Sequence, residues 1–332
     1  MPDVVLIEAT DAPPGSPLHY FADCQPSPAD FLAAVNLGFS QPQKNVPPMF
    51  FYDERGSALF NAICETAEYY VTRTEVALMN TVGDEIRELT PKGLTVVEYG
   101  CGSNLKIRAL LNALSGAAEY VAIDISREHL EAAAGEIAEE YPRLKVGAIC
   151  ADFNTDMRFP DGTGRPRLGF FPGSTIGNQT PTHARRLLGL MRNQLEDDGR
   201  LLIGVDLRKD PAILNAAYND AEGQTAAFNL NLLHRMNREL DAGIDVDAFA
   251  HKAFFNAGES RVEMHLVSLK DQTVEIGGRR FDFAEGETIH TENSYKYEIE
   301  RFGALAKSAG FDTVKVWTDS DKLFSIHYLT VA

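Results

Sequence analysis

The segment Val96–Ser103, which reads VVEYGCGS, constrains the fold more than any other part of the sequence. An apolar, β-branched run ends in the carboxylate of Glu98, and a turn containing Gly100 and Gly102 precedes a helical pattern that begins near Lys106. Glycine in such a turn lets the backbone approach a ligand where a Cβ atom would clash. The pattern predicts a nucleotide or nucleoside site in an α/β protein, although an ordinary strand, turn and helix without a ligand would fit it too.

A second strand supplies an acid for the same site. The segment Tyr120–Asp124 reads YVAID and ends in Asp124, 24 residues after Gly100. An acid at this spacing is placed to hold the two hydroxyls of a ribose. A dinucleotide fingerprint would have a third glycine where this chain has Leu105, and the carboxylate of Glu98 would repel a pyrophosphate. S-adenosylmethionine lacks phosphate and carries a sulfonium and an ammonium group, so the loop favours a methyltransferase.

Composition limits the class of partner. The 332 residues suffice for a large core and two lobes, and 44% hydrophobic with 24% charged residues is typical of a globular protein. A net charge of -17 predicts repulsion of phosphate backbones, so we expect no nucleic-acid partner. We also expect no membrane partner and a cytoplasmic location, because the sequence shows neither a signal peptide nor a long apolar run. A monomer is the default expectation for the oligomeric state. Scattered cysteines and histidines without ligand spacing predict reduced thiols and no metal site.

Alternating patterns around the loop predict a parallel, doubly wound sheet. The predicted strands are 95–99, 120–124, 145–150, 167–171 and 200–206, and the predicted helices between them are 105–114, 127–140 and 182–195. Helix 297–309 is predicted to cross over into a strand at 314–317, with a further strand at 324–331. Ligands of such sheets bind beyond the carboxyl ends of the strands. The loops there are 100–105, 124–126, 151–154 and 172–179.

About 90 residues interrupt this pattern after Asp206, too many for a connection within one domain. They contain a helical stretch at 211–238, an alternating strand at 261–269 and a hairpin at Gly277-Gly278. We therefore expect an inserted α+β lobe that binds the substrate. The expected division is 73–206 with 297–332 for the cofactor-binding domain, 23–72 with 207–296 for the substrate-binding domain, and 1–22 for a flexible N-terminal arm.

Polar residues follow the third and fourth predicted strands. Asp152 could accept a hydrogen bond from an adenine amino group while Phe153 packs on the ring, but a helix cap beside a core phenylalanine fits these two residues equally. The segment 172–178 reads PGSTIGN and gathers hydroxyl and amide groups where a methyltransferase presents its nucleophile. A turn without a function remains an alternative for it.

Two further motifs lie before the first strand of the expected sheet and where the inserted lobe rejoins it. The segment 72–75, TRTE, has the form of a capping box and predicts the start of a helix. On a strand, Glu292 and Ser294 would face the same side and could bind a small ring that carries N–H groups. A solvated edge strand would also explain this pair, and Met264 on the neighbouring strand would also fit a core position.

With these motifs the chain resembles the histidine-specific Nα-methyltransferases of ergothioneine biosynthesis, which make hercynine. The resemblance runs from about Asn45 to the end. It rests on the motifs FYDERGS at 51–57, EYY at 68–70 with TRTE at 72–75, GSTIGN at 173–178, Tyr218 with TAAFN at 225–229, and TENS at 291–294. The glycine loop, GCGSNLK at 100–106, departs from the Gly-Thr-Ser that relatives often carry, but it retains the lysine.

The resemblance implies a Rossmann-like class I S-adenosylmethionine-dependent methyltransferase with an inserted α+β substrate-binding domain. The S-adenosylmethionine pocket would be lined by Tyr52, Gly100, Lys106, Asp124, Asp152 and Phe153. The substrate carboxylate would be held by Asn178 and Tyr218, and the α-amine would be oriented by Gly173 and Thr175. The imidazole would be bound by Tyr69, Glu292 and Ser294, with Met264 and Phe60 shaping the wall of its pocket.

The implied reaction is the transfer of three methyl groups in succession to the α-nitrogen of L-histidine, with S-adenosylhomocysteine as the other product. Tyr52 or a chain of waters could carry away the amine proton. We therefore expect Tyr52, Gly173, Thr175 and Asn178 to act in catalysis. Three other functions stay open: an Nα-methyltransferase for another amino acid such as tryptophan, a catalytically silent S-adenosylmethionine-binding protein, and a protein or nucleic-acid methyltransferase, which the acidic composition disfavours.

Overall fold

The computed structural model describes residues 5–7, 10–12, 15–24, 29–159 and 165–332. The chain divides into two units, each made of segments that are distant in the sequence. The first unit comprises Met1–Gln25, Val71–Arg208 and Lys296–Ala332, and the second comprises Pro26–Tyr70 and Lys209–Tyr295.

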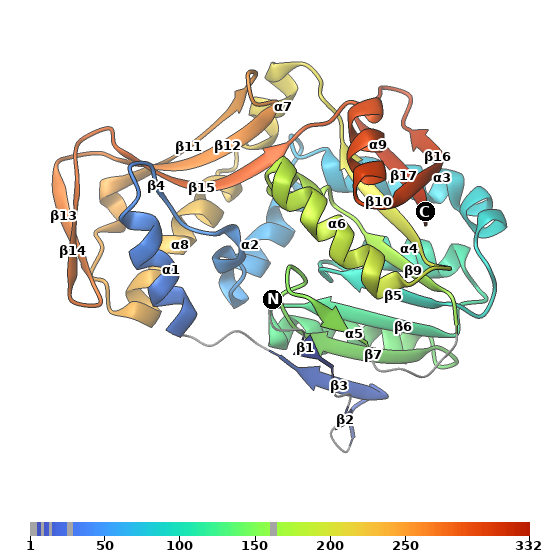
Figure 1. Ribbon diagram of the computed structural model, residues 1–332. Coiled ribbons are helices and arrows are strands. Elements are labelled where there is room, and N and C mark those ends of the chain that lie inside the picture. The colour runs from blue at the N-terminus through green and yellow to red at the C-terminus, as the bar shows by residue number, and fades with distance from the viewer. Residues whose placement is uncertain (1–4, 8–9, 13–14, 25–28, 160–164) are drawn as a thin grey trace. The chain divides into compact units, whose positions relative to one another are not determined.

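The first unit is built on a large sheet whose described strands have the order β16-β17-β10-β9-β5-β6-β7-β3-β2 (Figure 1). Their bounds are β2 Thr10–Asp11, β3 Tyr20–Asp23, β5 Thr95–Tyr99, β6 Glu119–Asp124, β7 Lys145–Cys150, β9 Arg167–Phe171, β10 Arg200–Asp206, β16 Phe311–Thr318 and β17 Phe324–Val331. A short parallel pair joins β1 (Val5–Leu6) to β8 (Met157–Arg158). The five strands and the intervening helices expected from the alternating pattern are confirmed.

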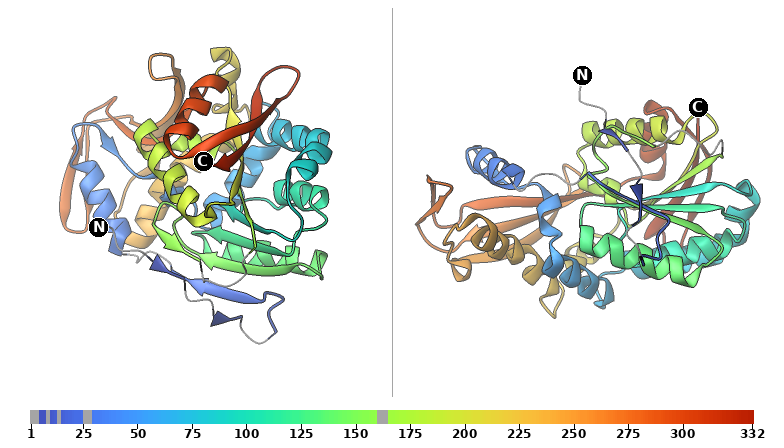
Figure 2. Two further views of the ribbon diagram at one scale, coloured as in Figure 1. Left: turned by 45° about the vertical axis from the view of Figure 1, so that its right-hand side comes forward. Right: turned by 90° about the horizontal axis from the view of Figure 1, so that it is seen from below.

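Helices cover both faces of this sheet. They are α3 Val71–Leu89, α4 Leu105–Ala113, α5 Arg127–Glu140, α6 Pro181–Leu195 and α9 Ile299–Ser308. The view from below shows α5, in green, and α6, in yellow-green, on opposite faces (Figure 2). With both faces covered, β5 is buried at every position, which explains its continuous apolar run. Among the described residues, no helix combines the length and apolar character needed to cross a membrane.

The sheet is not parallel throughout. β17 pairs antiparallel with both β10 and β16, so β16 runs in the same direction as β10. Helix α9 is therefore the parallel crossover that the sequence predicted, and β17 then turns back between β10 and β16. Only a short turn separates the end of β16 from the start of β17, and a short turn can join only antiparallel neighbours.

The described part of the N-terminal segment differs from the flexible arm expected over residues 1–22. Tyr20–Asp23 form β3, which pairs parallel with β7, and β2 pairs antiparallel with β3. Gly147 on β7 makes room for the Tyr20 ring, because a Cβ atom at this position would lie 2.0 Å from Tyr20 Cζ. Residues 1–4, 8–9 and 13–14 of the expected arm lie outside the described residues.

The helix predicted to open at 72–75 is confirmed, but the capping box at Thr72 is wrong. Helix α3 begins at Val71, so Thr72 already lies within the helix. The carboxylate of Glu75, which is 1% exposed, instead accepts a hydrogen bond from the N–H of Gly173 at 2.8 Å and pairs with the ammonium of Lys106 at 2.8 Å. A buried carboxylate gains more from a cation and an N–H donor than from the start of its own helix.

The second unit is built on a smaller sheet with the order β11-β12-β15-β4 and a separate hairpin. The strands are β4 Lys44–Asn45, β11 Phe249–Asn256, β12 Arg261–Ser268, β13 Gln272–Ile276, β14 Arg279–Phe283 and β15 Thr288–Tyr295. The helices are α1 Ala29–Phe39, α2 Glu54–Glu65, α7 Pro211–Ala217 and α8 Gln224–Leu240, with 3-10 turns η1 Pro48–Phe51 and η3 Val246–Ala248. The predicted strand at 261–269 and the hairpin at Gly277-Gly278 are confirmed.

The helical stretch expected at 211–238 is two helices rather than one. Gly223 has a φ of +74° before α8, a left-handed conformation that no continuous helix accommodates. Asp220 caps α8 by accepting hydrogen bonds from the N–H groups of Gln224 and Thr225. Helix α8 then packs on α2 and on strands β11 and β12, which makes it the central helix of the second unit.

A buried ion pair joins the two points at which the chain leaves and re-enters the first unit. The ammonium of Lys296 lies 2.6 Å from the carboxylate of Asp206, and both side chains are at most 1% exposed. Next to this pair, Leu207 and Tyr297 form a parallel bridge. The two ends of the inserted segment are thus held together inside the first unit.

Replacing Lys296 by methionine should lower the free energy of unfolding by about 3–5 kcal/mol, because Asp206 would keep a buried and uncompensated charge. Urea denaturation followed by circular dichroism measures this loss. The matched control is Lys270→Met, which removes an exposed ion pair with Asp245 and should cost less than about 1 kcal/mol. Equal losses for the two variants would contradict the assignment.

Candidate functional site

Four loops lie together at one edge of the large sheet. Gly100 follows β5, Asp124 ends β6, Asp152 lies just after β7, and Gly173 lies just after β9. These strands are adjacent in the order β9-β5-β6-β7 and all run parallel, so their carboxyl ends meet at the same edge. The structure therefore brings together the four loops that the sequence predicted to surround a ligand.

The glycine loop exposes its backbone. Gly100 has a φ of +82°, a conformation that other residues adopt only with strain. A Cβ atom at this position would lie 3.6 Å from the Phe153 ring, so Phe153 packs next to Gly100. The Phe153 ring is held edge-on against Phe171 at 5.6 Å. No atom lies within 4 Å of the Cβ position of Gly102, so the described residues leave this side of the loop open.

Asp124 is held by its own loop. One carboxylate oxygen accepts a hydrogen bond from the N–H of Ser126 at 2.8 Å. Burial raises the pKa of Asp124 to about 6, and the Ser126 N–H and the nearby His129 limit this rise. At neutral pH the carboxylate is therefore ionised and able to accept hydrogen bonds from a pair of hydroxyls.

Glu98 behaves differently from the fixed anion that the loop sequence suggested. It is buried and accepts a hydrogen bond from the hydroxyl of Tyr120 at 2.5 Å. Burial raises the pKa of Glu98 to about 8, so the neutral form predominates at pH 7. A cationic group placed nearby would favour the ionised form, which makes this position responsive to positive charge.

Asp152 shapes the loop after β7. Its carboxylate accepts hydrogen bonds from the backbone N–H of Asn154 at 2.9 Å and from the Asn154 side chain at 2.7 Å. No helix follows it within the described residues around this loop, so the alternative of a helix cap is wrong. The bonds to Asn154 form an Asx turn, which fixes the carboxylate beside Phe153.

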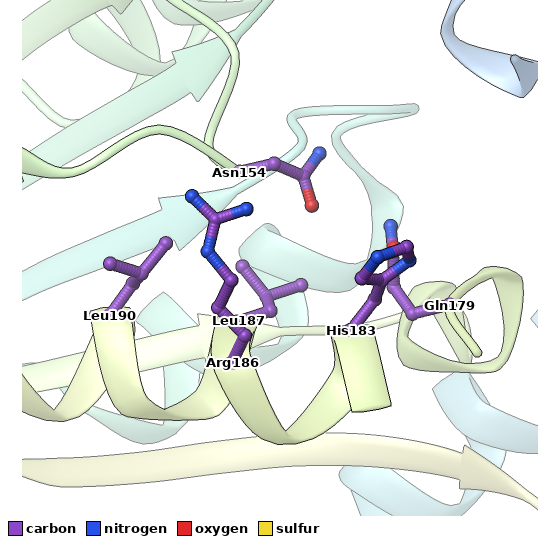
Figure 3. A pocket seen from close by; sticks show the side chains of 6 residues that line it. All are labelled: Asn154, Gln179, His183, Arg186, Leu187 and Leu190. Carbon is purple, nitrogen blue, oxygen red and sulfur yellow. The ribbon is translucent and has the colours of Figure 1, made fainter. Parts of the chain in front are cut away.

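A small pocket borders the same loop and was not expected from the sequence. It has a volume of about 160 Å³, and Figure 3 shows its lining side chains Asn154, Gln179, His183, Arg186, Leu187 and Leu190. The pocket lies between the loop after β7 and the first half of α6. It is smaller than the roughly 300–1,000 Å³ typical of ligand pockets, so it does not by itself accommodate a nucleoside.

The turn after β9 has an unusual backbone. Gly173 and Ser174 have φ values of 78° and 56°, so two consecutive residues are left-handed. The 3-10 turn η2, Thr175–Asn178, follows, and the Thr175 hydroxyl donates to the carbonyl of Pro172 at 2.9 Å. Strain of this kind persists only where the surroundings enforce it and is concentrated at functional sites, which argues against a turn without a function.

Glu75 is the support of this turn, and the sequence analysis missed that role. Its bonds to the N–H of Gly173 and to Lys106 connect the turn to the helix that follows the glycine loop. Gly204 on β10 leaves space for it, because a Cβ atom there would lie 2.0 Å from the carboxylate. The sequence did contain a sign of this role. Glu75 lies at helical spacing from Met79 and Val82, so its carboxylate is on the buried, apolar face of α3.

The second unit carries a cluster of aromatic rings at the residues expected to bind a substrate. Tyr52 lies edge-on to Phe60 at 5.9 Å, Phe60 lies edge-on to Tyr69 at 6.3 Å, and Tyr69 lies edge-on to Tyr218 at 6.2 Å. Phe228 on α8 contacts both Tyr52 and Phe60 and was not predicted for this role. The rings come from both chain segments of the unit and form one continuous cluster, which we call the aromatic wall.

Tyr69 is a neutral phenol at physiological pH. Burial raises the pKa of its hydroxyl well above the usual value, and nearby Tyr218, Cys64, Tyr52 and Glu292 raise it further. Glu292 is thus near enough to Tyr69 to act on its hydroxyl electrostatically. Tyr69 can therefore offer a hydrogen-bond donor at the aromatic wall but no negative charge.

Met264, Glu292 and Ser294 share one face of the smaller sheet. Met264 pairs opposite Glu292, and Val262 pairs opposite Ser294, on strands β12 and β15. The Tyr218 hydroxyl donates to the Ser294 hydroxyl oxygen at 2.8 Å. Ser294 is only 5% exposed, so the alternative of a solvated edge strand does not apply to it.

The other face of this sheet holds one group of three potential metal ligands within the described residues: Glu263, His265 and His290. The two imidazole rings are stacked at 4.5 Å with an angle of 16° between their planes. Ring nitrogens in parallel planes cannot both direct their lone pairs at one ion. Glu263 is already paired with Arg261 at 2.8 Å and with His265 at 3.0 Å. The group is an internal ion-pair and stacking cluster.

Comparisons with known proteins show the family to which the chain belongs. A sequence model of the family described as histidine-specific methyltransferase, SAM-dependent, matches residues 31–331. The histidine N-alpha-methyltransferase of Mycolicibacterium smegmatis is 40% identical over 291 residues, which cover 86% of this chain and 90% of that protein. The protein of the same name from Mycobacterium tuberculosis is 39% identical over 290 residues, with the same shares covered.

A fungal relative is more distant and longer. Ergothioneine biosynthesis protein 1 of Neurospora crassa is 27% identical over 307 residues, which cover 86% of this chain but 33% of that protein. The family match and the open α/β sheet together give a Rossmann-like class I methyltransferase fold with an inserted α+β unit. The chain belongs to the family of histidine-specific, S-adenosylmethionine-dependent methyltransferases.

Proposed function

We propose that this protein transfers three methyl groups from S-adenosylmethionine to the α-amino nitrogen of L-histidine, giving hercynine, as the first step of ergothioneine biosynthesis. The observation that carries the proposal is the polar pair Glu292 and Ser294 on one sheet face, with Met264 opposite Glu292 and Tyr69 nearby. The names of the two mycobacterial relatives support the substrate, and the name of the Neurospora relative supports the pathway.

The first unit fits S-adenosylmethionine. Its loops offer the acids Asp124 and Asp152 around a glycine turn, and Glu98 near the end of β5 would ionise beside a positive charge, which suits a cationic nucleoside without phosphate. In this proposal Asp124 accepts hydrogen bonds from the ribose hydroxyls, and Asp152 with Phe153 receives the adenine. Gly100 and Lys106 border the same site, and Tyr52 of the second unit is also assigned to it. When bound, the cofactor supplies an electrophilic methyl group on a positively charged sulfur.

The polar pair of the second unit matches a neutral imidazole, which has one N–H donor and one acceptor nitrogen. The Glu292 carboxylate accepts from the ring N–H. In this proposal the Ser294 hydroxyl, which lies 2.8 Å from the hydroxyl of Tyr218, donates to the second ring nitrogen. An indole has a single N–H and no acceptor nitrogen, so this pair favours histidine over tryptophan. Phe60 and Met264 form the apolar sides of the pocket.

The α-amine must be neutral to attack the methyl group. We assign its orientation to Gly173 and Thr175, and we assign the substrate carboxylate to Asn178 together with Tyr218. The turn that carries Gly173, Thr175 and Asn178 is held by the buried Glu75, so these three residues are placed before the substrate binds. Tyr52 and water are the two candidates for carrying the amine proton to solvent. Such positioning supplies most of the rate acceleration, because no covalent intermediate is needed.

The reaction is tested by mass spectrometry of the protein incubated with S-adenosylmethionine and equal amounts of the twenty amino acids. We expect histidine alone to gain mass, ending at the trimethylated product. Methylation of another amino acid would support the broader alternative and overturn the roles of Glu292 and Ser294. Cofactor binding without any methylation would support a catalytically silent binding protein.

Glu292→Ala should raise the KM for histidine roughly ten- to a hundredfold, since a hydrogen bond to a charged group contributes about 1.5–3 kcal/mol. The KM for S-adenosylmethionine should change little. Steady-state kinetics with each substrate varied in turn measures both values. Glu275→Ala, at an exposed position on β13, is the control and should match the parent protein. Unchanged histidine kinetics in Glu292→Ala would refute the assigned role.

The affinity for S-adenosylhomocysteine should fall as the pH is lowered through about 6. The pKa of Asp124 is raised to about 6, so the carboxylate that accepts the ribose hydrogen bonds is present above this pH and is protonated below it. Calorimetric titrations between pH 5 and pH 8, as rough limits, should show this loss, and Asp124→Asn should bind weakly at every pH. If Asp124→Asn loses affinity with falling pH in the same way as the parent protein, Asp124 is not the group that causes the loss.

A further inference from the structure

A β-bulge lies directly before Glu292. Strand β12 pairs with β15 so that Met264 faces Glu292 and His265 faces His290. Consecutive residues of β12 are therefore opposite residues of β15 that are two apart. Thr291 is the extra residue, and it has no partner in the β12–β15 ladder.

The extra residue decides which face of the sheet Glu292 and Ser294 occupy. Side chains alternate along a strand, and directly paired residues share a face. Ile289 pairs with Leu266, on the same face of β12 as Met264, and Glu292 pairs with Met264. Without an extra residue, Ile289 and Glu292 would lie on opposite faces, because they are three positions apart. Thr291 thus moves Glu292 and Ser294 away from the face of His290 and onto that of Met264.

Two buried side chains satisfy the carbonyl groups of β12 at the bulge. The single hydroxyl hydrogen of Thr291 is shared between the side-chain oxygen of Asn229 at 2.8 Å and the carbonyl of Met264 at 3.0 Å. The Asn229 amide donates to the carbonyl of His265 at 3.0 Å. Asn229 is 0% exposed and comes from α8, which packs on β11 and β12 (Figure 1). Helix α8 therefore fixes the bulge through one amide.

The Asn229 amide also contacts β11, the strand that pairs with β12 on the side away from β15. The His265 carbonyl can only accept, so it fixes the Asn229 amide with its NH₂ group toward β12. The second hydrogen of that group donates to Nδ1 of His251 at 2.9 Å, which leaves the proton of this imidazole on Nε2. From there His251 donates to the carbonyl of Tyr218 at 2.9 Å. Burial lowers the pKa of His251, which favours this neutral form.

We propose that Asn229 and Thr291 are positioning residues that fix the β-bulge and thereby set the selectivity of the protein for the side chain of its substrate. They act through Glu292 and Ser294, which the bulge places on the correct face, and through Tyr218, which the His251 bond holds beside Ser294. This inference rests on the proposed function, because it concerns the same substrate site.

Isothermal titration calorimetry of the full chain tests the proposal, with L-histidine titrated at saturating S-adenosylhomocysteine. Thr291→Val keeps the shape of the side chain but removes the hydroxyl donor, and it should weaken histidine binding at least about tenfold. Thr291→Ser keeps the donor and should stay within about threefold of the parent protein. The affinity for S-adenosylhomocysteine, titrated separately, should change less than about twofold in both variants.

Parent-like histidine binding in Thr291→Val, or equal losses in both variants, would overturn the proposal. If Thr291→Val does not fold, the histidine affinity of Asn229→Ala compared with that of Asn237→Ala gives the same test. Asn237 lies on the same helix, and its amide holds both backbone groups of Ile244, away from the bulge. Asn229→Ala should lose at least about tenfold in histidine affinity and Asn237→Ala less than about twofold, and equal losses would contradict the proposal.

The failure of this inference differs from failure of the proposed function. A parent protein that binds S-adenosylhomocysteine but no histidine would refute the function itself. A parent protein that binds histidine, with variants that bind it equally well, would refute only the role of the bulge.

Discussion

The buried carboxylate of Glu75 holds the first unit together at its functional edge. A charge removed from water must find a cation and hydrogen-bond donors, and Glu75 finds them in Lys106 and in the N–H of Gly173. Three segments distant in the sequence are joined by this one group: helix α3, the helix after the glycine loop, and the left-handed turn after β9. The turn can keep its strained backbone because the carboxylate fixes its N–H, and Gly204 leaves the carboxylate the space it needs.

Much of the first unit could be predicted because its elements produce strong local patterns. Strands buried on both faces read as apolar runs, and the helices between them show a clear apolar stripe, so β5, β6, β7, β9 and β10 and their helices were found with bounds close to those observed. The antiparallel direction of β17 was not predicted, because the direction of a strand leaves no trace in its own pattern of side chains.

The features that escaped prediction depend on contacts between distant segments. Glu75 has the spacing of a capping box, and only its distance to Gly173 and Lys106 shows its actual role. The bulge at Thr291 is invisible to a two-residue periodicity, because the periodicity assumes that no residue is added. The placement of the expected site residues within each unit could be inferred from motifs, whereas the groups that hold them in place, such as Asn229, could not.

The bulge also has a consequence for how such a site can change. Substituting a side chain alters one contact, but inserting or deleting a single residue just before Glu292 would exchange the whole set of groups presented on that face of β15 for the set on the other. On that face, neighbouring side chains would take the place of the Glu292 carboxylate and the Ser294 hydroxyl, although neither residue had been substituted. Strand length is thus a second variable, beside residue identity, through which proteins with this sheet could diverge in the molecules they accept.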